Sequence, residues 1–296
     1  MKPESKLAIK ISGKEFIVTA EYLPVAGTEL TIDPKIFGSG VTAVNVADNH
    51  YGVSISSLAA SFALSQTGIE PVLQIITRDR NRIALQSDLL GAASLGIKNV
   101  LCLSGFHQTL IGCNESANVF DIDSIQLIDM VRKMNNGQLL DGSKIQGNFG
   151  MLIGAAANPD LKPIELNILR LSKKIAAGTN FIQTQPVFDV DVFKIWLEAV
   201  HTAGLADKVA ILAGVLPLKS AAQAKELTET HTDFVIPETI INSLTNAGDP
   251  EVQKKEGVKI AAEIIKELKD LPGLKGVHIL SGGNEAAINE LLAVIL

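Results

Sequence analysis

The chain alternates eight short apolar segments with longer segments in which apolar residues recur every three or four positions. The short segments are rich in β-branched residues and most end in Gly, Pro or a polar residue, which indicates buried strands. The longer segments have helical spacing, and three of them, 54–68, 82–96 and 165–178, end at a glycine. The predicted strands span residues 16–24, 43–48, 71–77, 99–105, 147–156, 181–188, 209–217 and 276–282.

Eight strands with intervening helices in a chain of 296 residues is the count of a (β/α)8 TIM barrel. Segments 238–248 and 258–270 add extra helices before the last strand. No linker or low-complexity tract interrupts the pattern, so we predict a single domain over residues 1–296. A doubly wound sheet is the competing fold, but no GxGxxG motif follows an early strand, and the GSG at 38–40 precedes one.

Composition narrows the class of protein. A formal charge of −6 and a pI near 5.4 argue against binding to nucleic acid or to an anionic membrane, which needs clustered basic residues. We expect no secretory signal, because the first ten residues lack an apolar region, and no membrane span. Cys102 and Cys113 form no CxxC motif, so we predict no zinc site, a core position for Cys102 and a reducing, cytoplasmic location.

The carboxyl ends of the strands form the active site of such a barrel, and two polar residues stand out there. Glu21 interrupts an apolar strand; a carboxyl among apolar neighbours has a raised pKa and can donate a proton near neutral pH. A solvated carboxylate at the strand end is the alternative. Gln185 can both donate and accept hydrogen bonds, as recognition of an amide-like heterocycle requires, although a hydrogen bond to a neighbouring loop is the alternative.

Charged and histidine residues follow several of the same strands. The run from Arg78 through Asp79 to Arg80 predicts an ion network that pins its loop, with direct ligand contact as the alternative. His107 follows a glycine at the end of strand 99–105 and is a weak candidate for ligand contact. His278, within the last strand, is predicted to be a hydrogen-bonded interior residue. The histidines lack the spacing of a metal triad, so we predict no metal site.

The chain resembles the methylenetetrahydrofolate reductase family, a flavin-bearing (β/α)8 barrel, over nearly its whole length. The resemblance is strongest to the short single-domain form that includes enzymes of acetogens. The matching segments, in the family's order, are AEYLP, VADNHYGVSISS, TRDRNRIALQSDLLGAASLGIKNVLCLSG, GAAANPD, KKIAAGTNFIQTQPVFD, ILAGVLPLKS and KGVHIL.

The resemblance implies a role for particular residues. Glu21 is implied as the acid that activates the methylene group of the folate, Gln185 as the hydrogen-bonding partner of the pterin, and Phe188 as part of the pterin site. Asp48 and Asn49 are assigned to the folate side as well. Lys174 matches a basic residue that faces the flavin phosphates. The residues implied on the flavin side are Gln74, Arg78, Gly105, Phe106, His107, Asn158 and Lys174.

One position departs from the family pattern. Members usually have Gly-Asp where this chain has Gly105-Phe106, and the resemblance places that aspartate near the flavin ring. A phenyl ring accepts no hydrogen bond and is bulkier, so it reshapes or fills part of a pocket there. Phe106 either stacks against a flavin or pterin, or closes a site that is no longer used. A third alternative is a shifted loop with Phe106 in the core.

Two functions of different class follow. The first is the family reaction, reduction of 5,10-methylenetetrahydrofolate to 5-methyltetrahydrofolate through bound FAD, with tetrahydrofolate as the substrate carrier and a possible electron-donor subunit. The second is a flavin-free methyltransferase between tetrahydrofolate and the cobalamin of a separate corrinoid protein, as in O-demethylation. A folate-binding protein without catalysis requires an idle Glu21. The outer helices permit a homo-oligomer.

Overall fold

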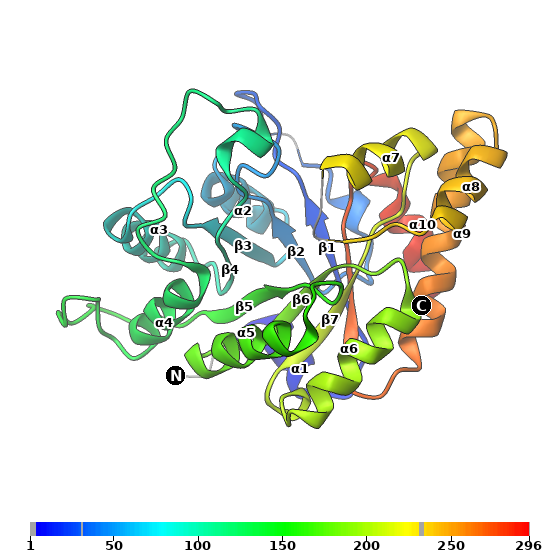
Figure 1. Cartoon of the computed structure of the whole chain (residues 1–296). Helices are drawn as coiled ribbons and strands as arrows, with labels where there is room; N and C mark the ends of the chain where they lie inside the picture. Colours follow the sequence, from blue (N-terminus) through cyan, green and yellow to red (C-terminus); the bar gives the residue numbers. More distant parts are fainter. Residues whose placement is uncertain (1–3, 31, 231–233, 296) are drawn as a thin grey trace.

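The computed structural model describes residues 4–30, 32–230 and 234–295. Eight strands close into a barrel in sequence order, with helices around the outside (Figure 1). The predicted (β/α)8 TIM barrel is therefore confirmed. The strands are β1 (Ile17–Tyr22), β2 (Ala43–Val46), β3 (Pro71–Ile76), β4 (Asn99–Leu103), β5 (Leu152–Ala157), β6 (Phe181–Pro186), β7 (Ala210–Val215) and β8 (Leu274–Ile279).

Strand β1 closes the barrel, because it pairs with β2 on one side and with β8 on the other. Thr19 shows this directly, since its register partners are Ala43 on β2 and His278 on β8. Every strand pair is parallel. All eight carboxyl ends therefore lie at one rim, where a barrel of this kind carries its active site.

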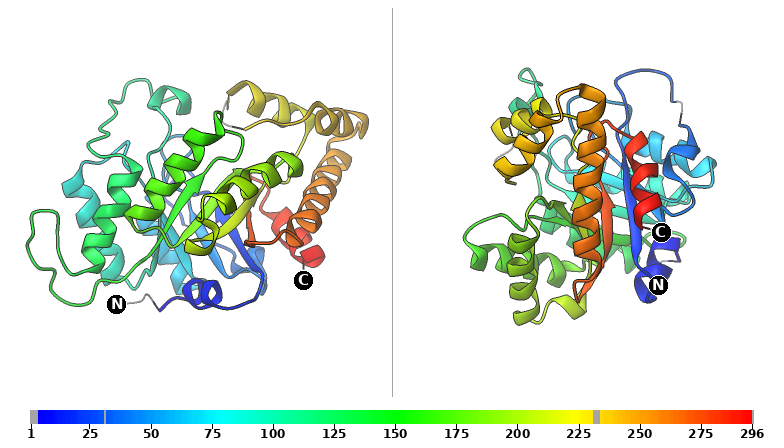
Figure 2. Two further views of the ribbon diagram at one scale, coloured as in Figure 1. Left: turned by 60° about the horizontal axis from the view of Figure 1, so that its bottom comes forward. Right: turned by 90° about the vertical axis from the view of Figure 1, so that its right-hand side faces the viewer.

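The helices cover the outer face of the barrel, and the two views of Figure 2 show α9 and α10 side by side near the C-terminus. The extra helices predicted before the last strand are present as α8 and α9. The helices are α1 (Lys6–Ser12), α2 (Ser57–Gln66), α3 (Arg82–Ser94), α4 (Ser124–Asn135), α5 (Ile164–Ala177), α6 (Val190–Thr202), α7 (Ala221–Thr230), α8 (Glu238–Asn246), α9 (Pro250–Lys269) and α10 (Ala286–Ile295); short 3-10 turns span Pro34–Phe37, Gln108–Ile111 and Ala206–Lys208.

Most boundaries lie within three residues of the prediction, and two differ by more. Strand β5 begins at Leu152, five residues later than predicted, because Gly147 has a φ of +85° and holds the preceding chain in a turn. Helix α9 begins at Pro250 rather than at residue 258. The side chain of Asp249 caps it by accepting from the Glu251 N–H at 2.9 Å, and proline is favoured in the first helical turn.

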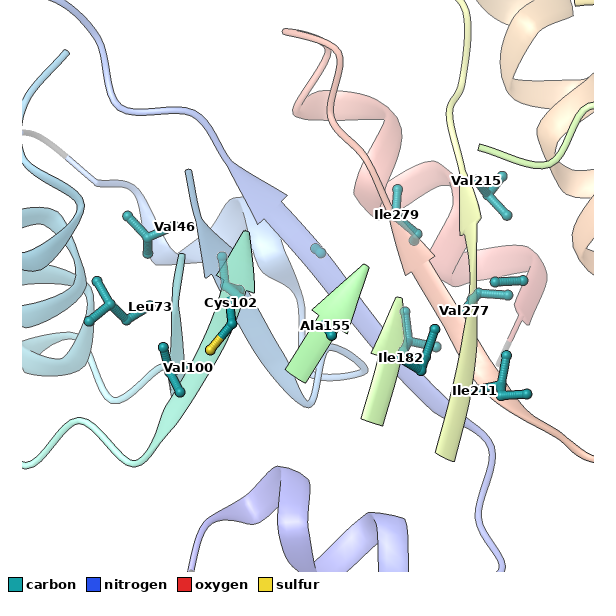
Figure 3. Close-up of a cluster of buried hydrophobic side chains, with 14 of the residues drawn as sticks. Val46, Leu73, Val100, Cys102, Ala155, Ile182, Ile211, Val215, Val277 and Ile279 are labelled. Carbon is teal, nitrogen blue, oxygen red and sulfur yellow. The ribbon is translucent and has the colours of Figure 1, made fainter. Parts of the chain in front are cut away.

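The main core lies between the barrel and the helices. Side chains that point outward from the strands fill it, including Val46 on β2, Ile182 on β6 and Val277 on β8 (Figure 3). Cys102 is fully buried in this cluster, which confirms its predicted core position. This layer holds the helices on the barrel and leaves the inward-facing side chains to form the interior.

The interior of the barrel is apolar at the amino-terminal end of the strands. Leu7 on α1 packs with inward-facing residues, among them Ile17, Leu101 and Phe181. The Phe181 ring requires a glycine opposite it, because a Cβ at Gly154 would lie 2.3 Å from the ring. This apolar layer seals one end of the barrel, and ligand access is left to the other end.

No helix in the three described ranges is both long enough and apolar enough to cross a bilayer. Residues 1–3, which begin the segment from which we predict the absence of a secretory signal, lie outside the described residues. The single domain over residues 1–296 stays a prediction.

Candidate functional site

Three adjoining cavities open at the carboxyl ends of the strands. The lateral groove, of about 600 Å³, runs beside α5 and is lined by Asn158, Arg170 and Lys174 among others. The central chamber, of about 190 Å³, shares Gln185 with the groove. The open cavity, of about 680 Å³, lies between the loop after β4 and α7, and shares Phe106 with the chamber. Both the loop after β4 and α7 lie at the upper end of the barrel in Figure 1.

Glu21 is a buried acid near this rim. Alternation along β1 turns Thr19 and Glu21 inward, and only 5% of Glu21 is exposed, which rules out the solvated carboxylate. Burial raises the pKa of Glu21 to about 7, and a hydrogen bond from the backbone of Ser281 offsets part of that rise. The carboxyl is therefore divided between its acid and base forms near neutral pH.

Tyr51 lines the open cavity, and the charge of Glu21 affects the pKa of its hydroxyl. Tyr51 is 60% exposed, and its partial burial, followed by the carboxylates of Glu21 and Glu226, raises the pKa of Tyr51 to about 12. The hydroxyl therefore stays protonated at neutral pH and can donate a hydrogen bond. Glu21 acts on this hydroxyl through its charge, although Glu21 itself is not in the lining of the open cavity.

Two carboxamides line the central chamber. Gln74 on β3 is 5% exposed, and Gln185 on β6 is half-buried. Within the described ranges, neither side chain forms a hydrogen bond with another residue. Neither amide is sealed in the protein, because both side chains face the space of the chamber. These two side chains are thus available to a ligand with both donors and acceptors along one edge.

The predicted ion network in the loop after β3 is confirmed. Arg78 is buried and donates to both carboxylate oxygens of Asp79, at 2.6 and 2.9 Å. Its other N–H groups donate to the backbone oxygens of Asn49 and Phe106, each at 3.2 Å. Arg78 lines the chamber, but these four hydrogen bonds tie three loops together, and its contact with a cofactor stays a prediction.

A second ion pair fixes the end of β2. Arg80 donates to both oxygens of Asp48, at 2.7 and 3.1 Å, and also pairs with Asp88. Asp48 accepts a further hydrogen bond from the Ile76 N–H. Asn49 has a φ of +46° and uses its side chain on Asp79 and Ser54. Asp48 and Asn49 line the chamber, yet their side chains form hydrogen bonds with residues of the neighbouring loops. Their role in folate binding stays a prediction.

Phe106 forms a wall between the central chamber and the open cavity. Its ring is half-buried and meets the His50 ring edge-on, with 5.8 Å between the ring centroids. Both residues line both spaces, so the alternative that placed Phe106 in the core is wrong. Gly105 permits this path, because it has a φ of +84° and a Cβ there would lie 3.2 Å from Arg78 Cβ. The stacking and closing alternatives both remain.

The lateral groove carries a cluster of cations. Lys174 Nζ donates to the Ala156 carbonyl at 2.6 Å, and burial, followed by the charge of Arg170, lowers the pKa of Lys174 to about 8. Arg170 and Lys173 also line the groove, and within the described chain neither forms an ion pair with a carboxylate. Neither residue was predicted from the sequence. Their spacing with Lys174 on one helix, at positions i, i+3 and i+4, was the available signal.

The other candidates lie elsewhere. Phe188 is buried against Phe234, with ring centroids 5.9 Å apart, in an apolar cluster beside α7 and α8, so its contact with the pterin stays a prediction. His107 is exposed, and its Nδ1 lies 2.8 Å from Thr109 Oγ1 in the loop after β4. His278 is buried and hydrogen-bonded, as predicted. Among the described residues, no three His, Cys, Asp or Glu side chains are grouped as metal ligands would be.

A closed barrel with a buried acid and two unpartnered carboxamides at its open end has the layout of a barrel that acts on a small heterocyclic ligand. The family model described as methylenetetrahydrofolate reductase matches residues 32–295. The chain belongs to this family.

Individual relatives agree with the family assignment. The 5,10-methylenetetrahydrofolate reductases of Salmonella typhimurium and Pectobacterium carotovorum are 32% and 24% identical over 72% of this chain, which covers 66% and 65% of their lengths. A probable methylenetetrahydrofolate reductase (NADPH) of Caenorhabditis elegans is 23% identical over 81% of this chain, which covers 34% of that protein. The chain thus spans just under two thirds of the bacterial relatives and about one third of the nematode one.

A solved structure has the same fold. It is an uncharacterized protein from Clostridium thermocellum described as binding two copies of 5-methyl-5,6,7,8-tetrahydrofolic acid. The TM-score is 0.68 at 15% sequence identity, and the match covers 98% of this chain and 99% of the other. At this identity, the likeness concerns the fold alone.

Proposed function

We propose that this chain is a folate one-carbon enzyme that reduces 5,10-methylenetetrahydrofolate to 5-methyltetrahydrofolate with bound flavin. The observation that carries the proposal is Glu21, a buried acid with a pKa of about 7 at the rim where the carboxamides of Gln74 and Gln185 lack partners. Membership of the family and the names of its relatives support the same substrate.

Glu21 is proposed as the general acid. The five-membered ring of the substrate holds its methylene carbon between N5 and N10, and that carbon accepts a hydride readily only after the bond to N10 breaks. A proton from the Glu21 carboxyl to N10 breaks this bond and leaves an electrophilic iminium at N5. A pKa near the working pH suits an acid that is re-protonated in every turnover.

Gln185 is proposed to orient the pterin. One edge of a pterin presents an amide-like array of donors and acceptors, and a carboxamide matches it with two hydrogen bonds. Gln74, which is buried on β3 and lines the same chamber, is proposed to hold the edge of the flavin in the same way. Both interactions satisfy groups that the described structure leaves unpaired.

The residues of the lateral groove fit the phosphate end of FAD. Three cations, Arg170, Lys173 and Lys174, line a groove that leads into the chamber, and among the described residues none of them pairs with a carboxylate. Burial, followed by the charge of Arg170, lowers the pKa of Lys174, and Asp123, which also lines the groove, offsets part of that fall. When bound, the flavin supplies the hydride; the protein supplies the cations, the orienting carboxamides and the proton.

Phe106 favours a second candidate function. Its ring occupies the wall of the chamber where the resemblance places a flavin-contacting acid, and the chamber is only about 190 Å³. In a flavin-free methyltransferase, Glu21 would manage the proton of tetrahydrofolate N5, and the cobalamin of a corrinoid protein would approach from the rim. We retain this as the alternative, together with the electron-donor subunit, the homo-oligomer and the cytoplasmic location as proposals.

Absorbance and calorimetry separate the two candidates. The purified protein, after incubation with FAD, is expected to show flavin absorption and to reduce 5,10-methylenetetrahydrofolate in the presence of a reductant. A colourless protein that binds tetrahydrofolate, takes up no FAD and transfers a methyl group to a corrinoid supports the alternative. An absence of heat with any reduced folate overturns both.

Phe106→Asp is a sharper test of the chamber. We expect the substitution to raise FAD affinity about tenfold, because it removes the bulk of the ring and adds an acceptor. Fluorescence quenching of the flavin measures the affinity, with Leu110→Asp as the control on the same loop but outside the chamber. Equal FAD affinity in the Phe106 variant and the wild type contradicts our interpretation of this residue.

A further inference from the structure

The interior of the barrel becomes polar one layer below Glu21. Four inward-facing side chains there, each no more than 3% exposed, are Thr19 on β1, Asn45 on β2, Gln183 on β6 and His278 on β8. We call them the polar layer. Branched apolar side chains ordinarily fill such a barrel, and buried polar groups are costly unless they are hydrogen-bonded. A polar layer at this depth is therefore expected to be fully hydrogen-bonded and to have a specific role.

Gln183 joins the polar layer into one network. Its Nε2 donates to Thr19 Oγ1 and to Asn45 Oδ1, both at 3.1 Å, and its Oε1 accepts from Asn45 Nδ2 at 2.7 Å. Thr19 Oγ1 lies 3.0 Å from His278 Nδ1, whereas the Val277 carbonyl is 3.5 Å away. Burial lowers the pKa of His278 to about 3, so the imidazole is neutral at working pH. In the tautomer that carries its proton on Nε2, Nδ1 accepts the Thr19 proton.

The network lies directly beneath the proposed site. Side chains two positions apart on a regular strand share a face, so Thr19 lies under Glu21. On β6 the register with β7 shifts between Gln183 and Pro186, and Gln185, which lies within this irregular stretch, lines the chamber. Strands β1 and β6 are not neighbours in the sheet. The hydrogen bond from Gln183 to Thr19 is thus a link across the interior between the strand that carries the acid and the strand that carries the carboxamide.

We propose that the polar layer sets the separation of Glu21 and Gln185, with Gln183 as a positioning residue for the proton transfer. Apolar side chains would fill the same volume, but their contacts have no preferred direction, so β1 and β6 could shift relative to each other. Directed hydrogen bonds define one arrangement, because each has a short optimal distance and a preferred angle. The inference rests on the proposed function for its activity readout only.

Three variants test the role of Gln183. Gln183→Met keeps the approximate volume and removes every hydrogen bond. Gln183→Glu is the conservative variant, because burial keeps its carboxyl neutral, with one donor and one acceptor. Ile182→Val, on the opposite face of β6, is the matched control for lost packing. We measure kcat and KM for reduced folate, together with the thermal midpoint of each variant.

We expect kcat to fall about 10- to 100-fold in Gln183→Met, and by less in Gln183→Glu, while KM changes less than about threefold. Ile182→Val should lower the thermal midpoint with kcat unchanged. Equal, near-normal kcat values in the Met and Glu variants overturn the proposal, since volume alone would then suffice. If Gln183→Met does not fold, Thr19→Val, which removes the hydroxyl at the other end of the link, takes its place.

A readout without substrate separates this inference from the proposed function. The titration of Glu21, followed by NMR of glutamate labelled at the side-chain carboxyl and assigned with Glu21→Gln, needs no turnover. We expect its midpoint to move by at least about half a pH unit in Gln183→Met and to stay in place in Ile182→Val. An unmoved midpoint contradicts the positioning role. Absent folate turnover in the wild type contradicts only the proposed function.

Discussion

Two buried carboxyl groups near the ends of adjacent strands have different partners. Glu21, on β1, is 5% exposed and receives a hydrogen bond from the backbone of Ser281. Asp48, after β2, is 3% exposed and accepts three hydrogen bonds, two of them from Arg80. The burial is the same, and the partners differ. Asp48 is one half of a two-pronged ion pair, whereas Glu21 forms no ion pair with any of the described residues.

The largest expected effect is loss of activity in Glu21→Gln. The amide keeps the shape of the side chain but has no proton to give at neutral pH. We expect kcat for folate reduction to fall about 10²- to 10⁴-fold, with the affinity for reduced folate within a few-fold of wild type. Steady-state kinetics and calorimetry measure the two quantities. Glu263→Gln, on the exposed face of α9, is the control, and near-normal turnover in Glu21→Gln would remove the acid assignment.

The fold and several residues of the candidate site could be predicted from the sequence. Strand endings located Glu21 and Gln185, and the run from Arg78 to Arg80 indicated an ion network, because these signals are local. The cations of the lateral groove could not be found in that way, since the rotation of α5 decides which of its faces meets the groove. The cross-barrel partners of Gln183 likewise require barrel closure, which brings together residues far apart in the chain. Phe188 lies next to the end of β6, yet its ring packs on Phe234.

Removing Arg80 should show how much the buried carboxylate of Asp48 depends on its cation. Arg80→Met leaves a buried carboxylate without its guanidinium, and breaking such a pair costs roughly 3 kcal/mol or more in the free energy of unfolding. Arg80→Lys retains the charge but loses the two-pronged geometry, so we expect a smaller loss. Urea denaturation measures both. A loss below about 1 kcal/mol in Arg80→Met would show that Asp48 does not need its partner.

The stability of the protein should record the raised pKa of Glu21. The pKa is about 7 in the folded protein and 4.5 ordinarily, so between these pH values the folded state holds the extra proton. The free energy of unfolding therefore falls as pH rises from about 4.5 to 7, by roughly 3 kcal/mol from this group. The difference in unfolding free energy between wild type and Glu21→Gln isolates the contribution. A difference that is flat with pH would place the pKa near its ordinary value.

Lys174 extends the comparison to a half-buried cation and gives the smallest expected effect. Its ammonium has a backbone carbonyl as partner, and burial together with Arg170 lowers its pKa to about 8. An anion in the lateral groove needs the charged form, so ADP, used as a diphosphate probe, should bind up to about tenfold more weakly at pH 9 than at pH 7. Lys174→Met should bind ADP weakly and equally at both pH values. Lys173→Met removes an exposed cation from the same groove and should weaken binding at both values while keeping the pH dependence.

If wild type binds ADP equally at pH 7 and pH 9, the Lys174 ammonium takes no part in anion binding, and the groove depends on Arg170 and Lys173 alone.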